Sequence, residues 1–159
     1  MHRQSLDCQF MALALTQAQL AYQMDEVPVG AIMVQGGRVI AAAHNLRESS
    51  HSAIAHAEVL AIEAACRAVG DWRLTDCTLY VTLEPWPMCA GAIINSRLER
   101  LVFGALDPSG GCCGSLINLL DLGFYHRPKL TYGIMDVECG GILSRFFGEK
   151  SLNPTAGQS

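Results

Sequence analysis

The sequence predicts an α/β protein, specifically a three-layer α/β/α sandwich built on a mixed five-stranded sheet. Its 159 residues are 50% hydrophobic and 16% charged, which suits one folded domain with a single core. A glycine pair between two segments rich in Val, Ile and Ala predicts a β-hairpin near the N-terminus. Further along the chain, segments with strand and helix patterns alternate, and such alternation is typical of a sheet covered by helices on both faces.

The first half of the chain is predicted to form a helix, the hairpin and a second helix. Apolar side chains from Leu6 to Met24 recur at steps of three and four, which indicates a helix of about five turns that ends before Pro28. Gly36-Gly37 supplies the positive φ angles of a tight hairpin turn. A polar segment then leads to the second helix, which ends at Gly70. The predicted bounds are residues 6–24 and 56–69 for the helices and residues 29–34 and 39–43 for the strands.

The second half is predicted to add three strands and three helices. The β-branched and aromatic residues 78–82 indicate a strand that stops at Pro85, because proline lacks the N–H that a strand donates. Pro87 suits the first turn of a helix, where that N–H would be unpaired in any case. The predicted bounds are residues 78–83, 101–103 and 130–134 for the strands and 87–96, 115–121 and 136–147 for the helices. We expect one domain over residues 1–148 and a disordered tail over residues 149–159.

The charge and the cysteine count narrow the class of protein. The formal net charge is −4, so the whole molecule is not expected to attract a polyanion, and any basic face is expected to come from residues 96–159. The apolar stretch at residues 10–15 is far shorter than the roughly 18–20 residues of a membrane span, and it does not look like a secretory signal. Seven cysteines favour reduced thiols over a disulfide framework. We therefore expect a soluble, cytoplasmic protein with no membrane partner.

Two short motifs carry residues that could do chemistry. His56-Ala57-Glu58 stands at the start of a predicted helix, where such a triplet is more often a surface or capping arrangement than a site. Cys89 stands in the first turn of the helix that follows Pro85, where the helix dipole favours a thiolate, although a lone cysteine is more often a small core residue. Together the motifs are far more specific, because both helix starts lie at the same edge of one sheet.

The pair of motifs has the layout of the zinc deaminase signature, H-x-E followed by P-C-x-x-C. The chain therefore resembles the bacterial tRNA-specific adenosine deaminases of the cytidine deaminase superfamily. Other segments support the resemblance, which extends to about residue 148. These segments are residues 27–31, 44–47, 102–105, 114–116 and 138–139.

The resemblance implies a zinc-dependent enzyme that hydrolyses adenosine to inosine at the wobble position of tRNA anticodons. His56 and Cys89 would hold one Zn²⁺ per subunit, whose bound water would attack C6 of adenine as hydroxide. Glu58 would move the protons without being a zinc ligand. The implied partners are the tRNA anticodon stem-loop and a second copy of the chain, and the apolar segments 90–94 and 116–120 also favour a homodimer.

The resemblance also implies substrate contacts. Asn45 would hydrogen-bond the nucleoside, Pro28, Val29 and Ala31 would line its pocket, and Asp107 would face the neighbouring nucleotides. Each of these residues also has a simple structural interpretation, as a turn residue, a strand residue or a loop cap.

One residue departs from the family pattern at the centre of the site. Trp86 stands where the signature has its first cysteine, and an indole N–H only donates, so it cannot bind zinc. Cys112, Cys113 and His51 are the candidate replacement ligands. We favour a single substitution in a chain otherwise complete for catalysis. Two alternatives stay open, namely an inactive RNA-binding protein or partner subunit and a deaminase of free bases or nucleosides.

Overall fold

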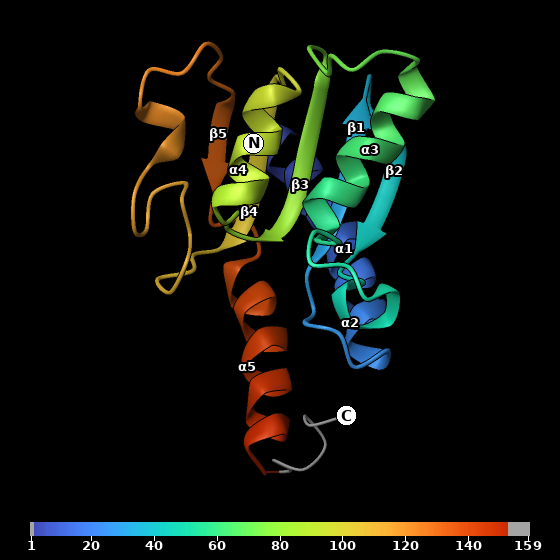
Figure 1. The fold of residues 1–159 in the computed structure, drawn as a ribbon, viewed down its shortest axis with the longest axis vertical. Helices are drawn as coiled ribbons and strands as arrows, with labels where there is room; N and C mark the ends of the chain where they lie inside the picture. Colours follow the sequence, from blue (N-terminus) through green and yellow to red (C-terminus); the bar gives the residue numbers. More distant parts are fainter. Residues whose placement is uncertain (1, 153–159) are drawn as a thin grey trace.

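The structure is a computed structural model that describes residues 2–152 (Figure 1). Within these residues, eleven helices and strands follow one another in the order that the sequence predicts, with one short helix added. They are α1 (His2–Gln23), β1 (Gly30–Gln35), β2 (Arg38–His44), α2 (Arg47–Ser50), α3 (Ala57–Val69), β3 (Cys77–Leu83), α4 (Pro87–Asn95), β4 (Arg100–Ala105), the 3₁₀ helix η1 (Leu119–Asp121), β5 (Lys129–Tyr132) and α5 (Asp136–Leu152).

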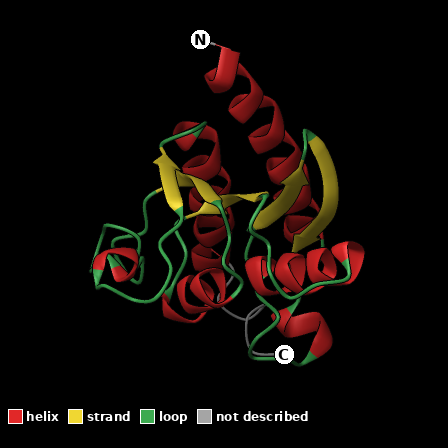
Figure 2. Cartoon of the chain, turned by 90° about the horizontal axis from the view of Figure 1, so that it is seen from above, coloured by secondary structure: helices red, strands yellow, loops and turns green. Residues whose placement is uncertain are grey.

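The five strands form one mixed sheet in the order β2-β1-β3-β4-β5. β1 runs antiparallel to both β2 and β3, whereas β3, β4 and β5 are parallel. Seen from above, helices cover the sheet on both sides (Figure 2). The predicted three-layer α/β/α sandwich on a mixed five-stranded sheet is confirmed.

The alternation of side chains along the strands builds two cores, one on each face of the sheet. In β1, Ala31 and Met33 join the core that includes residues of α3 and α4, whereas Ile32 and Val34 join the core that includes residues of α1 and α5. Successive strand residues point to opposite faces, and both faces here are covered by helices, so both sets are apolar. In β4, Val102 lies in the second core between two residues of the first.

Helix α1 is fixed to the sheet by a close approach and by a buried ion pair. A Cβ atom on Gly30 would lie 2.0 Å from the carbonyl oxygen of Ala14, so only glycine lets α1 cross β1 there. Asp7 of α1 pairs with Arg100 of β4 at 2.6 Å and also accepts a hydrogen bond from Tyr80 of β3 at 2.7 Å.

Three local predictions differ from the structure. Of the helix predicted over residues 115–121, only η1 forms, because the backbone before it is held by other contacts described below. Helix α2 arises in the polar segment, for which no helix was predicted, and there Glu26 accepts the N–H groups of Glu48 and Ser49. Helix α5 includes residues 149–152 of the predicted tail, and the rest of that tail lies outside the described residues. Over residues 2–152, no helix combines the length and apolarity that a membrane span needs.

Candidate active site

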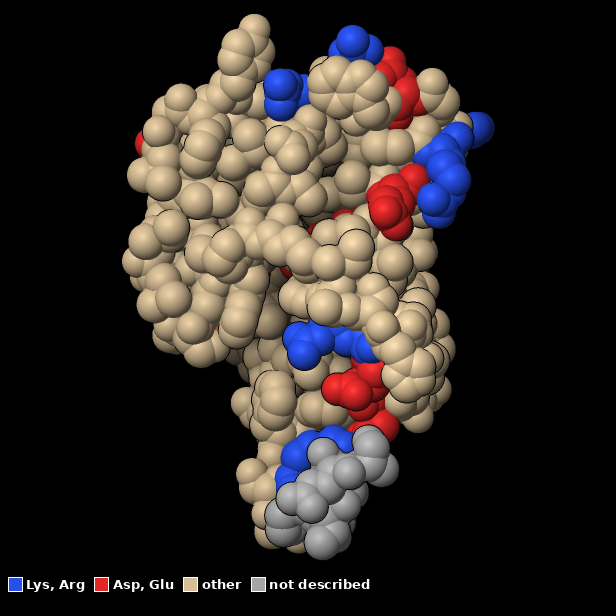
Figure 3. Space-filling model, viewed as in Figure 1, with Lys and Arg blue, Asp and Glu red and all other residues tan. Residues whose placement is uncertain are grey.

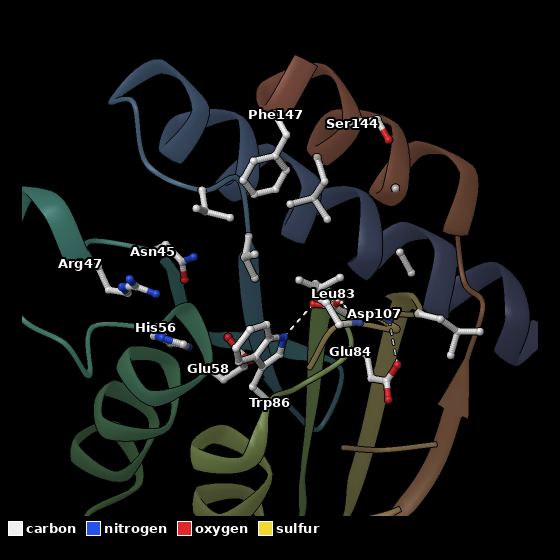
Figure 4. Close-up of a pocket in the computed structure, with 17 residues that line it drawn as sticks. Asn45, Arg47, His56, Glu58, Leu83, Glu84, Trp86, Asp107, Ser144 and Phe147 are labelled. Atoms are coloured by element: carbon white, nitrogen blue, oxygen red, sulfur yellow. Dashed lines mark hydrogen bonds between the residues drawn. The ribbon is translucent and has the colours of Figure 1, made fainter. Parts of the chain in front are cut away.

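A cavity of about 460 Å³ opens beyond the ends of β3 and β4 (Figure 4). Ligands of open α/β sheets bind at this kind of edge, outside the carboxyl ends of parallel strands. Its walls come from segments far apart in the sequence. Among the lining residues are Asn45, His56, Glu58, Trp86, Asp107 and Phe147.

The structure brings the two sequence motifs together beside this cavity. His56 is the N-cap residue of α3, Glu58 lies in its first turn, and Cys89 lies in the first turn of α4. One potential ligand atom from each of these three side chains lies within 4.8 Å of the others. The Sγ of Cys89 is 3.6 Å from Nδ1 of His56. Two helix starts that are adjacent in space thus place three metal-binding side-chain types in contact.

Burial controls the ionisation of these three side chains. It lowers the pKa of His56, with a smaller contribution from Arg47, so the imidazole is neutral at pH 7 with a free lone pair. Burial raises the pKa of Glu58, which forms no ion pair with a Lys or Arg of residues 2–152. Burial, then the nearby Glu58 carboxyl, also raises the pKa of Cys89. The stabilisation of a Cys89 thiolate by the helix dipole stays a prediction, because burial and Glu58 act in the opposite direction.

The donor set does not match a catalytic zinc that leaves Glu58 free for proton transfer. Such a zinc has three protein ligands and one open position. His56 and Cys89 supply two donors, Trp86 supplies none, and the third donor in the cluster is Glu58 itself. Among residues 2–152, His56, Glu58 and Cys89 are the group of three or more potential metal donors that converges. Cys112, Cys113 and His51 lie outside this group. Cys112 instead donates to the carbonyl of Gly110.

Trp86 is fixed at the wall of the cavity. Its Nε1 donates to Oδ2 of Asp107 at 2.7 Å (Figure 4). The backbone of Gly110 lies against the ring, because a Cβ on Gly110 would be 2.1 Å from Cε2 of the indole. The side chain is nevertheless 43% exposed and lines the cavity.

The predicted substrate residues divide into two groups. Asn45, Val29 and Asp107 line the cavity. Oδ1 of Asn45 accepts the N–H of Ala57 at 2.9 Å, which orients the amide and leaves its NH₂ without a partner among the described residues. Pro28 and Ala31 are not among the lining residues, and Ala31 instead belongs to the core that includes residues of α3.

Asp107 is bound by its own loop as well as by Trp86. Its carboxylate accepts the N–H and hydroxyl of Ser109 at 3.0 and 2.6 Å. Burial raises its pKa, but the hydrogen bonds from Ser109 and Trp86 outweigh burial and lower it. Asp107 is therefore a carboxylate at pH 7.

Glu84 is an important residue that the sequence analysis did not single out. It is 1% exposed and accepts the N–H groups of Asp107, Cys113 and Ser115 at 2.9, 3.0 and 2.9 Å. Its carboxylate also contacts the Ser115 hydroxyl, and a Cβ on Gly111 would lie 2.2 Å from its Cδ. Glu84 thus holds the glycine-rich loop, residues 106–115. A charged residue at the end of a strongly apolar strand is the sequence signal that could have found it.

Comparisons with known proteins identify the family. The chain matches the model of the MafB19-like deaminases over residues 7–143. The chain belongs to this deaminase family. It is 54% identical over 141 residues to the tRNA-specific adenosine deaminase of Bacillus subtilis (strain 168), with 88% of each chain covered.

Two solved structures extend this comparison. This deaminase superposes with a TM-score of 0.83 on a structure from studies of A-to-I editing by tRNA:A34 deaminases at the wobble position of transfer RNA, at 43% identity over 85% of this chain and 99% of the other. A guanine deaminase from Bacillus subtilis is 38% identical, with a TM-score of 0.59 and coverage of 62% and 63%. Of these two structures, the tRNA:A34 deaminase matches more of the chain.

The charges of this deaminase are mixed on the face shown in Figure 3. Among the described residues there, Lys and Arg occur in separate groups, several beside Asp or Glu, and no broad basic surface covers the face. Four basic residues of residues 96–152 form ion pairs with Asp or Glu, namely Arg100, Arg127, Lys129 and Lys150. The basic face expected from residues 96–159 is not confirmed on this side.

Proposed function

We propose that the cavity of this deaminase binds adenosine of a tRNA anticodon stem-loop and is arranged to convert it to inosine. The observation that carries the proposal is the convergence of His56, Glu58 and Cys89 at one cavity, in a chain 54% identical to a tRNA-specific adenosine deaminase. The buried Glu58 is the group that moves protons, because burial raises the pKa of its carboxyl and so favours a proton carrier that can both accept and donate. The free NH₂ of Asn45 is directed to the nucleoside.

Trp86 limits the activity of the native chain. With His56 and Cys89 as the remaining ligands, we expect Zn²⁺ to bind weakly and deamination to run near background. The test compares the native chain with Trp86→Cys for zinc content, melting temperature and adenosine-to-inosine conversion on an anticodon stem-loop. Restoration of one zinc per chain together with turnover supports the proposal. A native chain that already holds one zinc tightly and turns over normally would overturn it.

A second candidate function is supported by Trp86 itself. An indole at the ligand position suits a protein that binds RNA without changing it, alone or as the partner of an active subunit. If Trp86→Cys restores zinc but not deamination, this second function replaces the first. Parallel assays with free guanine, cytosine and nucleosides test the remaining alternative, for which the guanine deaminase of Bacillus subtilis is the relevant relative.

The partners and location follow from the same proposal. The tRNA substrate places the protein in the cytoplasm, and we propose that it acts as a homodimer. Leu116 and Ile117, which belong to a segment predicted to pair two copies, are 59% and 48% exposed. In contrast, Ala90, Ile93 and Ile94 of α4 are buried in the chain's own core, so they do not supply that surface.

A further inference from the structure

We propose that the indole of Trp86 is a stacking surface for a nucleobase, so that the cavity binds a purine base without a metal ion. The inference rests on the proposed function for the kind of base, but it assigns Trp86 a role that the family pattern does not contain. It follows from how the ring is held, what supports it and what faces it.

The ring is held in one orientation. The hydrogen bond from Nε1 to Asp107 fixes its polar edge at 2.7 Å, and Gly110 lies against its six-membered ring. A Cβ on Gly110 would come within 2.1, 2.4 and 2.5 Å of Cε2, Cζ2 and Cδ2, so the glycine backbone packs on a ring face. Side chains fixed before binding lose less conformational entropy when a ligand arrives.

The loop that holds the ring is itself fixed. Glu84 accepts three backbone N–H groups of the glycine-rich loop, including that of Asp107. The loop residues that touch the indole are therefore anchored to the end of β3, the strand that leads into Trp86. A ring supported in this way behaves as a rigid wall of the cavity.

The other side of the ring is open to a cavity with suitable chemistry. Trp86 is 43% exposed, and a second aromatic side chain, Phe147, lines the same cavity and is 52% exposed. The unpartnered NH₂ of Asn45 and the imidazole of His56 lie across the cavity from the indole (Figure 4). A flat heterocycle with polar edges fits these surroundings, and bases stack on aromatic side chains without needing a particular sequence.

The test measures equilibrium binding in the presence of a metal chelator. Two synthetic RNA hairpins serve as probes, one with adenosine at the first anticodon position and one with an abasic ribose there. We expect the native chain to bind the adenosine hairpin more tightly by roughly 5- to 150-fold, the range for one stacked base. Trp86→Leu should remove most of this difference.

The chain offers a matched control in its other tryptophan. Trp72 is 52% exposed, stacks with Arg73 and does not line the cavity, so Trp72→Leu should leave the difference between the hairpins unchanged. The sequence has two tryptophans, so tryptophan fluorescence of Trp72→Phe comes from Trp86. Its fluorescence should be quenched by the adenosine hairpin and not by the abasic one, which tests the native indole even if Trp86→Leu folds poorly.

Equal affinity for the two hairpins, or no quenching, would overturn the inference. Tighter binding by Trp86→Leu would also overturn it, because the indole would then be a plug that fills the base site. The proposed function fails separately, if zinc-loaded Trp86→Cys does not deaminate the adenosine hairpin.

Discussion

At the scale of single residues, the side chain at position 86 determines which ligands this corner of the cavity can bind. A cysteine there would add a third donor beside His56 and Cys89, whereas tryptophan adds a ring and one N–H. The structure accommodates the larger side chain only because residue 110 has no Cβ. Substitutions at Trp86 and Gly110 should therefore have non-additive effects on the free energy of unfolding.

We expect Gly110→Ala to destabilise the native chain by about 1–3 kcal/mol, the usual cost of overpacking. The added Cβ would lie 2.1 Å from the indole, so the ring or the loop must move. In the Trp86→Cys background the same substitution should cost much less. Urea unfolding of the four proteins gives the coupling free energy, and additive effects would show that the ring does not pack on residue 110.

At the scale of elements, the glycine-rich loop depends on a residue distant in sequence. Glu84 stands 23 to 31 positions before the residues whose N–H groups it accepts. Its carboxylate has no cationic partner among the described ion pairs, so backbone N–H groups and one hydroxyl satisfy it. Substitution of Glu84 should therefore lower the stability of the glycine-rich loop.

Glu84→Gln should lower the free energy of unfolding by about 1–3 kcal/mol, because the amide NH₂ would face backbone N–H groups and leave at least one unpaired. Hydrogen exchange at Asp107, Cys113 and Ser115 should become faster, while the β1 amides keep their protection. Ser115→Ala is the matched control, since it removes one hydroxyl and leaves three backbone hydrogen bonds. Unchanged exchange in Glu84→Gln would mean that the loop holds itself.

The difference between local sequence patterns and contacts between distant segments explains which features the sequence could predict. The strands, the main helices and the convergence of His56 with Cys89 follow from local periodicity and from the way parallel strands end at one edge. The predicted helix over residues 115–121 failed because Ser115 bonds to Glu84, a contact between segments that local propensity does not contain. Pro28 and Ala31 do not line the cavity, and sequence alone does not show which residues of this segment face it.

Helix α1 gives a prediction about pH at the same scale. Burial alone would raise the pKa of Asp7, but hydrogen bonds from Arg100 and Tyr80 outweigh burial and hold it below its ordinary value. Ionised Asp7 therefore stabilises the fold above about pH 3.9, its value in an unfolded chain, and this stability is lost as the pH falls through the lower folded value.

Asp7→Asn should destabilise the chain by about 3 kcal/mol at pH 7, because it leaves the buried Arg100 guanidinium without its counterion. The difference from the native chain should be smaller at pH 3, which lies below the unfolded value of about 3.9, because Asp7 of the unfolded chain is then largely protonated. Urea unfolding at both pH values measures it. Asp71→Asn, which removes a pair exposed to solvent, should have no measurable effect at either pH. A pH-independent cost for Asp7→Asn would point to packing rather than charge.

At the scale of the whole molecule, two adjacent apolar side chains stay exposed on one face of the sandwich. On the side of α4, the segment before η1 exposes Leu116 and Ile117, although neither contributes to the cavity. Adjacent apolar side chains that stay in water favour association with another surface. In the proposed homodimer, this other surface belongs to a second copy of the chain.

We expect sedimentation at micromolar concentration to show a dimer, and the double substitution Leu116→Glu with Ile117→Glu to shift it toward monomer by placing two charges in the contact. Both side chains are about half exposed or more, so the folded monomer should survive, which circular dichroism would verify. Leu13→Glu is the matched control, because Leu13 is 45% exposed on α1 and lies on the opposite side of the sheet. A native chain that sediments as a monomer would contradict the proposed homodimer. A dimer that persists in the double variant would place the contact elsewhere on the molecule.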